Sequence, residues 1–131
     1  AAARQQPCPL RGKRRMGIRA SLAAAAGGIG RANGANFCSA TAGIAVLTKC
    51  MAIELAPRIR VNRLVPWSVQ TEEVVERYHL RTEEGLRKEL SSLPLGRLGE
   101  FKELTDMAHC IVNATYTTGA KFFVNGGQDL H

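Results

Sequence analysis

The sequence predicts an α/β fold built on a parallel sheet, and three observations support this. Residues 59–65 alternate apolar and polar side chains and run into Pro66, which is typical of a β-strand. Residues 39–55 carry apolar side chains at three- and four-residue intervals, which predicts a helix. Further helical segments and a last apolar strand follow, and this alternation favours parallel strands covered by helices.

The first part of the chain offers weaker signals. Residues 16–22 are a possible first strand, and the run of Ala, Gly and Asn over residues 23–36 favours a loop. The helix over residues 39–55 ends at Pro57. Its expected buried face consists of Ile44, Leu47, Met51 and Leu55.

The second part of the chain is easier to divide. Residues 72–90 are charged and predict one helix, supported by oppositely charged pairs four residues apart. A turn-rich link follows, and residues 101–113 predict a helix that is apolar on one side. Residues 121–125 predict a short strand, closed by Gly126 and Gly127.

The net charge of +7 is concentrated at one end of the chain. Residues 1–20 hold six basic side chains and no acid, whereas the rest holds 12 basic and 11 acidic ones. We therefore expect a basic, disordered arm over residues 1–15 before a nearly neutral domain over residues 16–131. The arm has no aromatic residue to stack on a base, so specific nucleic-acid binding is not expected.

The cysteines favour a reducing compartment, because none of the four has the CxxC spacing of a zinc or redox site. Cys38, Cys50 and Cys110 lie among apolar residues, so we expect small core side chains and no metal site. A cytoplasmic protein is expected, although the Arg-rich, acid-free start keeps a mitochondrial location open. No membrane-spanning helix is expected, because Lys49 and Glu54 interrupt the best apolar run.

Three blocks of sequence carry a resemblance to a known family. They read FCSATAGIAVLTKCMAIELAPRIRVNRLVPWSVQT (residues 37–71), PLGRLGE (residues 94–100) and TTGAKFFVNGG (residues 117–127). In this order they resemble the C-terminal half of a short-chain dehydrogenase/reductase, with a weaker likeness to the carbonyl- and sugar-reductase members. The resemblance implies a partial doubly wound, Rossmann-like parallel sheet with flanking helices, and a nicotinamide cofactor, NAD or NADP.

The family's chemistry depends on a Tyr and a Lys four residues apart on the helix that begins the first block. This spacing places both side chains on one helix face. The Lys lowers the pKa of the phenol, and the Tyr exchanges a proton with the substrate oxygen. Here the matching positions are Phe37 and Thr41, which have neither an exchangeable phenol proton nor a charge. A reaction on a carbonyl or alcohol is therefore expected to be impaired or lost.

The resemblance assigns further positions at the ends of the strands over residues 16–22 and 59–65. The family's Ser, which hydrogen-bonds the substrate carbonyl, falls at Ala24 when counted back from Phe37 without gaps. Ser21 takes this role if the following loop is a few residues longer, but an ordinary strand-end Ser is the favoured reading. After the second strand the family has Pro-Gly and then a hydrophobic residue and a Thr near the nicotinamide carboxamide. This chain keeps Pro66, Val69 and Thr71, but has Trp67 in place of the glycine. Helix N-capping is an equally good reading of Thr71.

The glycine-rich residues 23–34 superficially resemble the family's phosphate-binding loop. That loop needs its own preceding strand and an acidic residue about twenty positions later. Here the next helix begins only a few residues on, so phosphate binding by Gly28 and Gly30 is the less favoured reading.

Two functions remain open from the sequence. The first is an NAD(P)-dependent oxidoreductase with replaced catalytic residues, acting on a small carbonyl substrate if any activity remains. The second is a non-catalytic interaction module or truncated gene product that forms a homo-oligomer or pairs with an intact relative. In the family the helix over residues 39–55 usually meets a partner subunit, and an unpaired sheet edge would favour association too.

Overall fold

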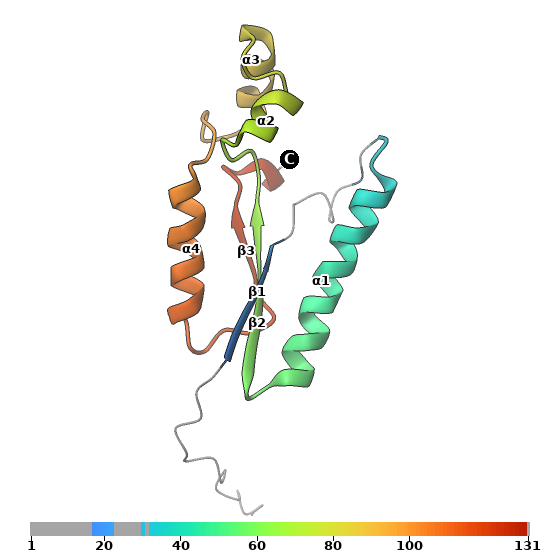
Figure 1. Ribbon diagram of the computed structural model, residues 1–131, viewed down its shortest axis with the longest axis vertical. Coiled ribbons are helices and arrows are strands. Elements are labelled where there is room, and N and C mark those ends of the chain that lie inside the picture. Colours follow the sequence, from blue (N-terminus) through green and yellow to red (C-terminus); the bar gives the residue numbers. More distant parts are fainter. Residues whose placement is uncertain (1–16, 23–29, 31, 131) are drawn as a thin grey trace, which may run out of the picture.

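The computed structural model describes residues 17–22, 30 and 32–130 of the chain. The basic arm and Gly28 of the glycine-rich loop lie outside the described residues. Within them the expected α/β architecture is confirmed: a parallel sheet lies between helices (Figure 1).

Three parallel strands form the sheet in the order β1 (Gly17–Leu22), β2 (Ile59–Pro66) and β3 (Lys121–Val124). All three strands were expected, with limits that agree within one residue. β1 and β2 pair over their shared length, and β3 pairs with the second half of β2. Because the strands are parallel, their carboxyl ends gather at one edge of the sheet, where ligands of such sheets bind.

Two long helices flank the sheet on opposite sides, α1 (Ala35–Leu55) and α4 (Phe101–Asn113) (Figure 1). Two short helices, α2 (Glu72–Arg77) and α3 (Glu83–Ser91), lie beyond the carboxyl end of the sheet. A single 3-10 turn, η2 (Gln128–Leu130), follows β3. The central strand β2 is therefore covered on both faces, and Val61, Leu64 and Val65 are all buried.

Two polar side chains of β2 anchor the segment that joins α4 to β3. The buried Arg60 guanidinium donates to the carbonyl oxygens of Val112 and Ala114 at 2.7 Å, and to those of Ile111 and Thr117 at 3.2 Å. The carbonyls of Ile111 and Val112 belong to the last turn of α4, where carbonyl oxygens have no N–H donor within the helix, and those of Ala114 and Thr117 follow it. Nearby, the Asn62 side-chain amide donates to the Thr117 carbonyl at 3.0 Å.

The amide oxygen of Asn62 accepts from the Ala120 backbone N–H at 3.1 Å, so both ends of this fully buried side chain are satisfied. The segment between α4 and β3 is thus held from inside the sheet by side chains rather than by apolar packing alone. This places β3 beside β2 with its register fixed, and with it the turn that follows β3 at the carboxyl edge.

Three expectations about the helices were wrong. The helix over residues 39–55 begins earlier, at Ala35, where the Gly34 carbonyl accepts the Cys38 N–H at 2.7 Å. Its buried residues are Thr41, Thr48 and Ala52, and Leu47 is exposed. Residues 72–90 form two helices instead of one, because the backbone turns at residue 79 with φ 53° and Thr82 caps α3.

The cysteine and membrane expectations also need correction. Cys50 and Cys110 are exposed and Cys38 is half-buried, so none of the three is a fully buried core side chain. Among the described residues, α1 is the one helix that is long and apolar enough to cross a membrane, by length and composition alone. Core helices of globular proteins can be equally long and apolar, and α1 packs against β2 (Figure 1).

Candidate functional site

Phe37 and Thr41, which the resemblance matches to the family's Tyr and Lys, lie on the first two turns of α1, at the carboxyl edge of the sheet. Phe37 is partly exposed, with 39% of its surface accessible. Thr41 is buried, and its hydroxyl donates to the Phe37 carbonyl at 2.8 Å. The Thr41 hydroxyl proton is therefore engaged inside the helix, and neither side chain carries a charge.

Ser21 is the last residue but one of β1 and pairs in register with Arg63 of β2. It thus stands near the carboxyl end of its strand, as the resemblance requires. Arg63 itself is half-buried, and burial lowers the pKa of its guanidinium. Its other register partner is Lys121 of β3, so two basic residues occupy neighbouring positions in this row.

The loop after β2 is held by backbone pairing on both sides. Pro66 ends the strand, and the Trp67 N–H donates to the Val124 carbonyl at 3.1 Å. Ser68 adopts φ 39°, and its hydroxyl donates to the Glu89 carboxylate on α3. Val69 is buried and forms a bridge to Gly99. The loop is therefore braced by three separate segments of the chain.

Thr71 caps α2. Its hydroxyl oxygen accepts the Val74 N–H at 3.3 Å, and two acidic residues follow in the first turn of the helix. N-capping is thus a structural role that this side chain fulfils, as the sequence allowed. The candidate site residues all lie toward the carboxyl side of the sheet, but in four separate segments. These are β1 (Ser21), α1 (Phe37), β2 (Pro66) and the loop between β2 and α2 (Val69 and Thr71).

Sequence reasoning missed a cavity that lies beside this loop. It has a volume of about 370 Å³ and is lined by Trp67, the link between α3 and α4, and the turn after β3. None of the described α1 residues lines it. The PLGRLGE block was the one sequence signal for this cavity. It places an Arg and two Gly residues in a link between two helices, close to the carboxyl edge of the sheet.

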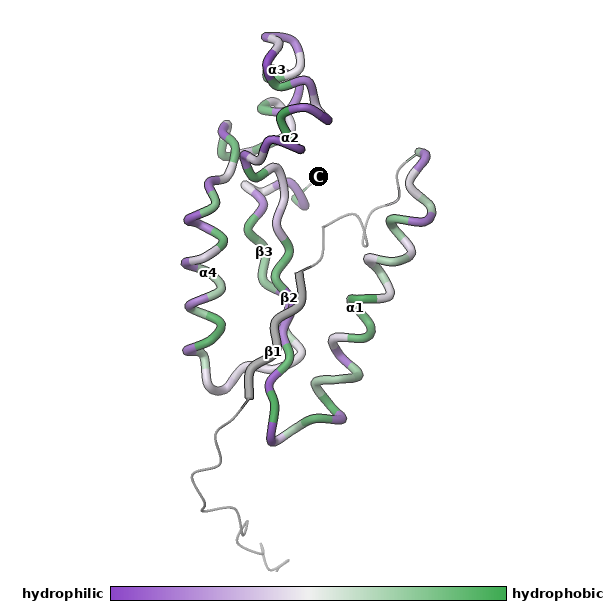
Figure 2. The backbone as a smooth tube through the Cα atoms, viewed as in Figure 1, coloured by the Kyte–Doolittle hydropathy of each residue, from purple (hydrophilic) through white to green (hydrophobic). Residues whose placement is uncertain are grey.

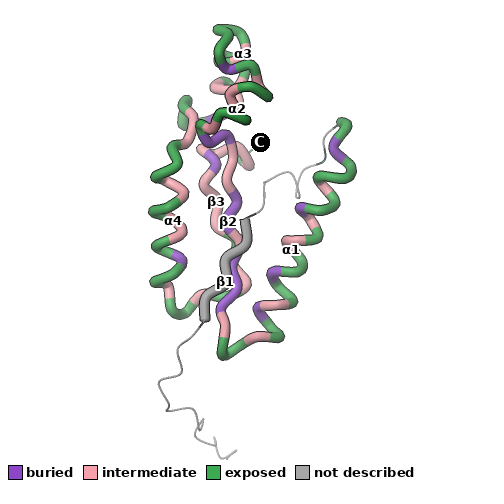
Figure 3. The backbone as a smooth tube through the Cα atoms, viewed as in Figure 1, coloured by how far each residue is buried: buried purple, intermediate pink, exposed green. Residues whose placement is uncertain are grey.

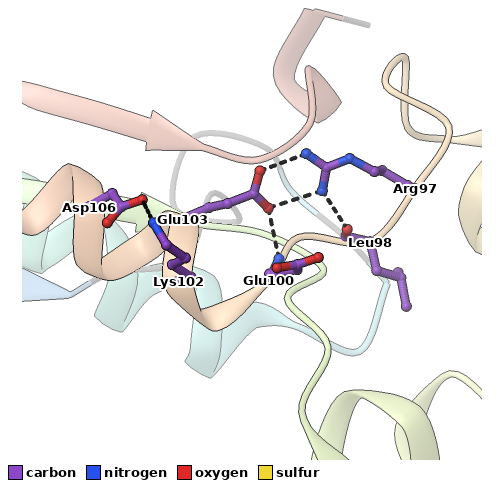
Figure 4. Close-up of polar contacts among 6 residues, drawn as sticks. All are labelled: Arg97, Leu98, Glu100, Lys102, Glu103 and Asp106. Atoms are coloured by element: carbon purple, nitrogen blue, oxygen red, sulfur yellow. Dashed lines mark hydrogen bonds and ion pairs between the residues drawn. The ribbon is translucent and has the colours of Figure 1, made fainter.

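A paired charge stands at the rim of the cavity (Figure 4). The Arg97 guanidinium donates to the two carboxylate oxygens of Glu103 at 2.6 and 3.0 Å. Glu103 also accepts the Glu100 backbone N–H at 2.8 Å at the start of α4. The hydrogen bond from Arg97, and next the one from Glu100, lower the pKa of Glu103 to about 2. Its carboxylate is thus ionised at neutral pH.

The described residues fit the nicotinamide end of a dinucleotide only in part. Val69 and Thr71 stand where the resemblance places them, but the first is buried and the second caps a helix. The indole of Trp67 occupies the place of a glycine, where a backbone can approach a ligand closely. In the described part of the chain, no three His, Cys, Asp or Glu side chains gather as metal ligands would.

Comparison with known proteins gives consistent relatives. The family model described as "Enoyl-(Acyl carrier protein) reductase" matches residues 5–129. The chain is 33% identical to 3-oxoacyl-[acyl-carrier-protein] reductase FabG of Haemophilus influenzae over 90% of this chain and 48% of that protein. It is also 33% identical to glucose 1-dehydrogenase 2 of Bacillus subtilis, over 72% of this chain and 37% of that protein. The chain thus spans about half the length of the curated relatives it matches.

Solved structures agree with the fold. A short-chain dehydrogenase/reductase of the glucose/ribitol dehydrogenase type from Brucella melitensis superposes with a TM-score of 0.73 at 28% identity, over 85% of this chain and 44% of that one. A 4-hydroxyisoleucine dehydrogenase mutant complexed with NADH and succinate gives 0.82 at 24% identity, over 88% of this chain and 48% of that one. The family model matches residues 5–129, which is nearly the whole of this chain. The chain therefore belongs to the short-chain dehydrogenase/reductase family and corresponds to the C-terminal part of its domain.

Proposed function

We propose that the chain derives from NAD(P)-dependent oxidoreductases of carbonyl and alcohol substrates, and that its own proton transfer is impaired or lost. The observation that carries this proposal is the pair Phe37 and Thr41 on α1. In the family the Tyr at the first position exchanges a proton with the substrate oxygen, and the Lys at the second lowers the pKa of that Tyr. The nicotinamide supplies or accepts the hydride. Here the first side chain has no proton to exchange, and the hydroxyl of the second donates into its own helix.

The expected loss can be given a size. A positioned general acid typically contributes about 10²–10⁴-fold to a rate. Without a phenol at position 37 and without a cation to lower its pKa, little turnover by this route is expected. NAD and NADP both occur among the relatives' cofactors, since one solved relative holds NADH and a gluconate 5-dehydrogenase from Burkholderia cenocepacia holds NADP. Either cofactor is therefore included in the test.

Restoring both side chains tests the proposal. We expect the double variant Phe37→Tyr, Thr41→Lys to oxidise reduced nicotinamide at least about 10²-fold faster than the unmodified chain, with a 3-oxoacyl thioester as substrate. The chain supplies a matched control on α4, where Phe101 and Thr105 have the same residue types at the same spacing. Phe101→Tyr, Thr105→Lys should leave the rate unchanged.

Two results would contradict this proposal. If the unmodified chain already turned substrate over as fast as the restored variant, the replaced residues would not be limiting. If the restored variant bound cofactor and remained inactive, loss of Tyr and Lys would not explain the inactivity. Cofactor binding is followed separately by the fluorescence of Trp67, the only tryptophan in the sequence. NADH or NADPH should quench it, and failure of both would count against a working cleft.

A second candidate function is supported by the outer face of α1. Figure 2 shows that α1 is apolar along most of its length rather than along one stripe, and Figure 3 shows exposed residues all along it. The exposed residues on this face include Gly43, Val46, Leu47, Cys50 and Ile53. A side chain at Gly43 would meet no atom within 4 Å, so packing inside this chain does not require a glycine there.

A glycine inside a helix costs about 0.5–1 kcal/mol relative to alanine, and it lets another backbone approach closely. Contiguous exposed apolar surfaces of this kind mark association sites. We therefore propose that α1 meets α1 of a second copy, with Cys50 near the middle of the contact. Copper-catalysed oxidation should then cross-link two chains through Cys50, and Ile53→Lys should prevent it. Val112→Lys on α4 is the matched control; cross-linking with an intact relative in place of a second copy would overturn the choice of partner.

A further inference from the structure

The cavity beside Trp67 adjoins the loop after β2 but is lined by neither Phe37 nor Thr41. Glu103 of α4 lines it, whereas Phe37 and Thr41 belong to α1, which lies on the opposite side of the sheet from α4 (Figure 1). At about 370 Å³ it falls within the range of about 300–1,000 Å³ that small-molecule pockets occupy. What this cavity takes therefore goes beyond the proposed function.

The walls of the cavity are preformed. Gly126 and Gly127 both adopt positive φ, and a side chain at Gly127 would stand 2.9 Å from the Pro94 ring. Pro94 thus already touches this turn and cannot move further in. On the opposite side, the hydrogen bond from Ser68 to Glu89 fixes the loop that carries Trp67. A cavity held from two sides does not collapse when empty, so little binding energy is lost in ordering it.

The polar groups of the walls are already paired. The Leu95 N–H donates to the Gly126 carbonyl at 3.1 Å, and the Gly99 N–H donates to the Ser68 carbonyl at 3.0 Å. The Asn125 side chain accepts the Gly127 N–H at 3.1 Å and donates to Asp129. What remains toward the interior is apolar surface from Leu93, Phe123 and Val124. A charged ligand would lose its hydration there without gaining a partner.

The charged rim supports the same choice of ligand. Arg97 and Glu103 form an ion pair through two hydrogen bonds, so together they add no net charge to the rim (Figure 4). We propose that this cavity is a binding site for an uncharged apolar group, an aromatic ring or a short branched chain, and that Trp67 forms part of its wall. Small-molecule pockets are lined mainly by apolar side chains, and such a lining favours an uncharged apolar group.

Toluene is a suitable probe, with benzoate as its charged counterpart of the same ring. We expect toluene to change the emission of Trp67 saturably, with a Kd of about 1 mM or tighter, and benzoate to bind at least about tenfold more weakly. Val124→Phe fills the cavity and should weaken toluene binding at least about tenfold. Val112→Phe, the same substitution at an exposed position outside the cavity, should leave binding unchanged.

Leu95→Phe provides a second filling variant in case Val124→Phe does not fold, because Leu95 lines the cavity and is 67% exposed. Its control is Leu86→Phe on α3. A response to toluene that does not saturate, or one that survives both filling variants, would overturn the proposal. Equal or tighter binding of benzoate would show that Arg97 serves an anion instead. Toluene binding does not depend on hydride transfer, so it can succeed where the restored catalytic pair fails.

Discussion

At the scale of single residues, Arg60 of β2 stabilises the end of α4 and the segment that follows it. The guanidinium is buried without a carboxylate and instead donates to four carbonyl oxygens around the end of α4. A cation at this place is favoured, because the last carbonyls of a helix carry a partial negative charge. Only a planar, multiply donating group satisfies several of these carbonyls at once.

Arg60→Met should lower the free energy of unfolding by about 2–4 kcal/mol, because each buried acceptor left unpaired costs about 1–3 kcal/mol. Arg60→Lys should recover only part of this loss, since one ammonium cannot reach all four carbonyls. Urea unfolding of the variants gives the values. Arg58→Met, at an exposed position two residues earlier, serves as control, and an equal effect of both Met substitutions would refute the capping role.

A second residue-scale prediction concerns Arg63, which faces Lys121 in the strand register and has its pKa lowered by burial. Like charges at neighbouring positions of a sheet destabilise it, and half-burying a cation adds desolvation. Arg63→Leu should therefore raise the melting temperature, by about 2–5 °C if about 0.5–1 kcal/mol is regained. Calorimetry decides the sign, and a lowered melting temperature would mean that Arg63 makes a favourable contact in solution.

At the scale of elements, the start of α4 depends on one carboxylate. Glu103 accepts from Arg97 and from the Glu100 backbone N–H, which lower its pKa from 4.5 to about 2. A carboxylate with a lowered folded-state pKa stabilises the fold above its ordinary pKa, and this stabilisation is lost as pH falls toward the folded value. The effect should thus be complete at pH 7 and disappear between about pH 4.5 and 2.

Glu103→Gln should melt below the unmodified chain at pH 7, and the difference should shrink through that window until the two coincide near pH 2. Because the side chains of Arg97 and Glu103 are 54% and 37% exposed, added salt should reduce the difference. Melting curves followed by circular dichroism at several pH values test this. Glu84→Gln on α3 is the control; a difference that persisted to pH 2 would assign it to packing.

The elements also show where sequence patterns carry information and where they do not. Residues 101–113 alternate clearly between apolar and polar faces, and α4 has the predicted limits. In α1, apolar residues surround the helix, so no periodicity could show that Leu47 faces outward and Thr48 inward. The break between α2 and α3 depends on residue 79, whose backbone turns with φ 53°. The sequence does not predict this turn, because the residues on both sides of it favour a helix. The cavity was missed because distant segments meet to form it.

At the scale of the whole molecule, few apolar side chains are buried in the described residues, and α1 and α4 are the two long helices that cover the sheet. Half of the buried apolar side chains of the described residues are on β2 or in the loop that follows it, and α1 contributes only Ala52. The outer face of α1 remains apolar and exposed, with Ile53 at 80%. If a second copy covers this face, folding and association are linked, because the partner binds the folded chain alone.

The melting temperature should then rise with protein concentration, by about 2–5 °C for each tenfold increase, since a tenfold change is worth about 1.4 kcal/mol per association event. Ile53→Lys should abolish this dependence and lower the melting temperature at high concentration to the value of the dilute protein. Val112→Lys should retain the full dependence. A melting temperature independent of concentration in the unmodified chain would show that it folds alone, and the α1 face would then need a different explanation.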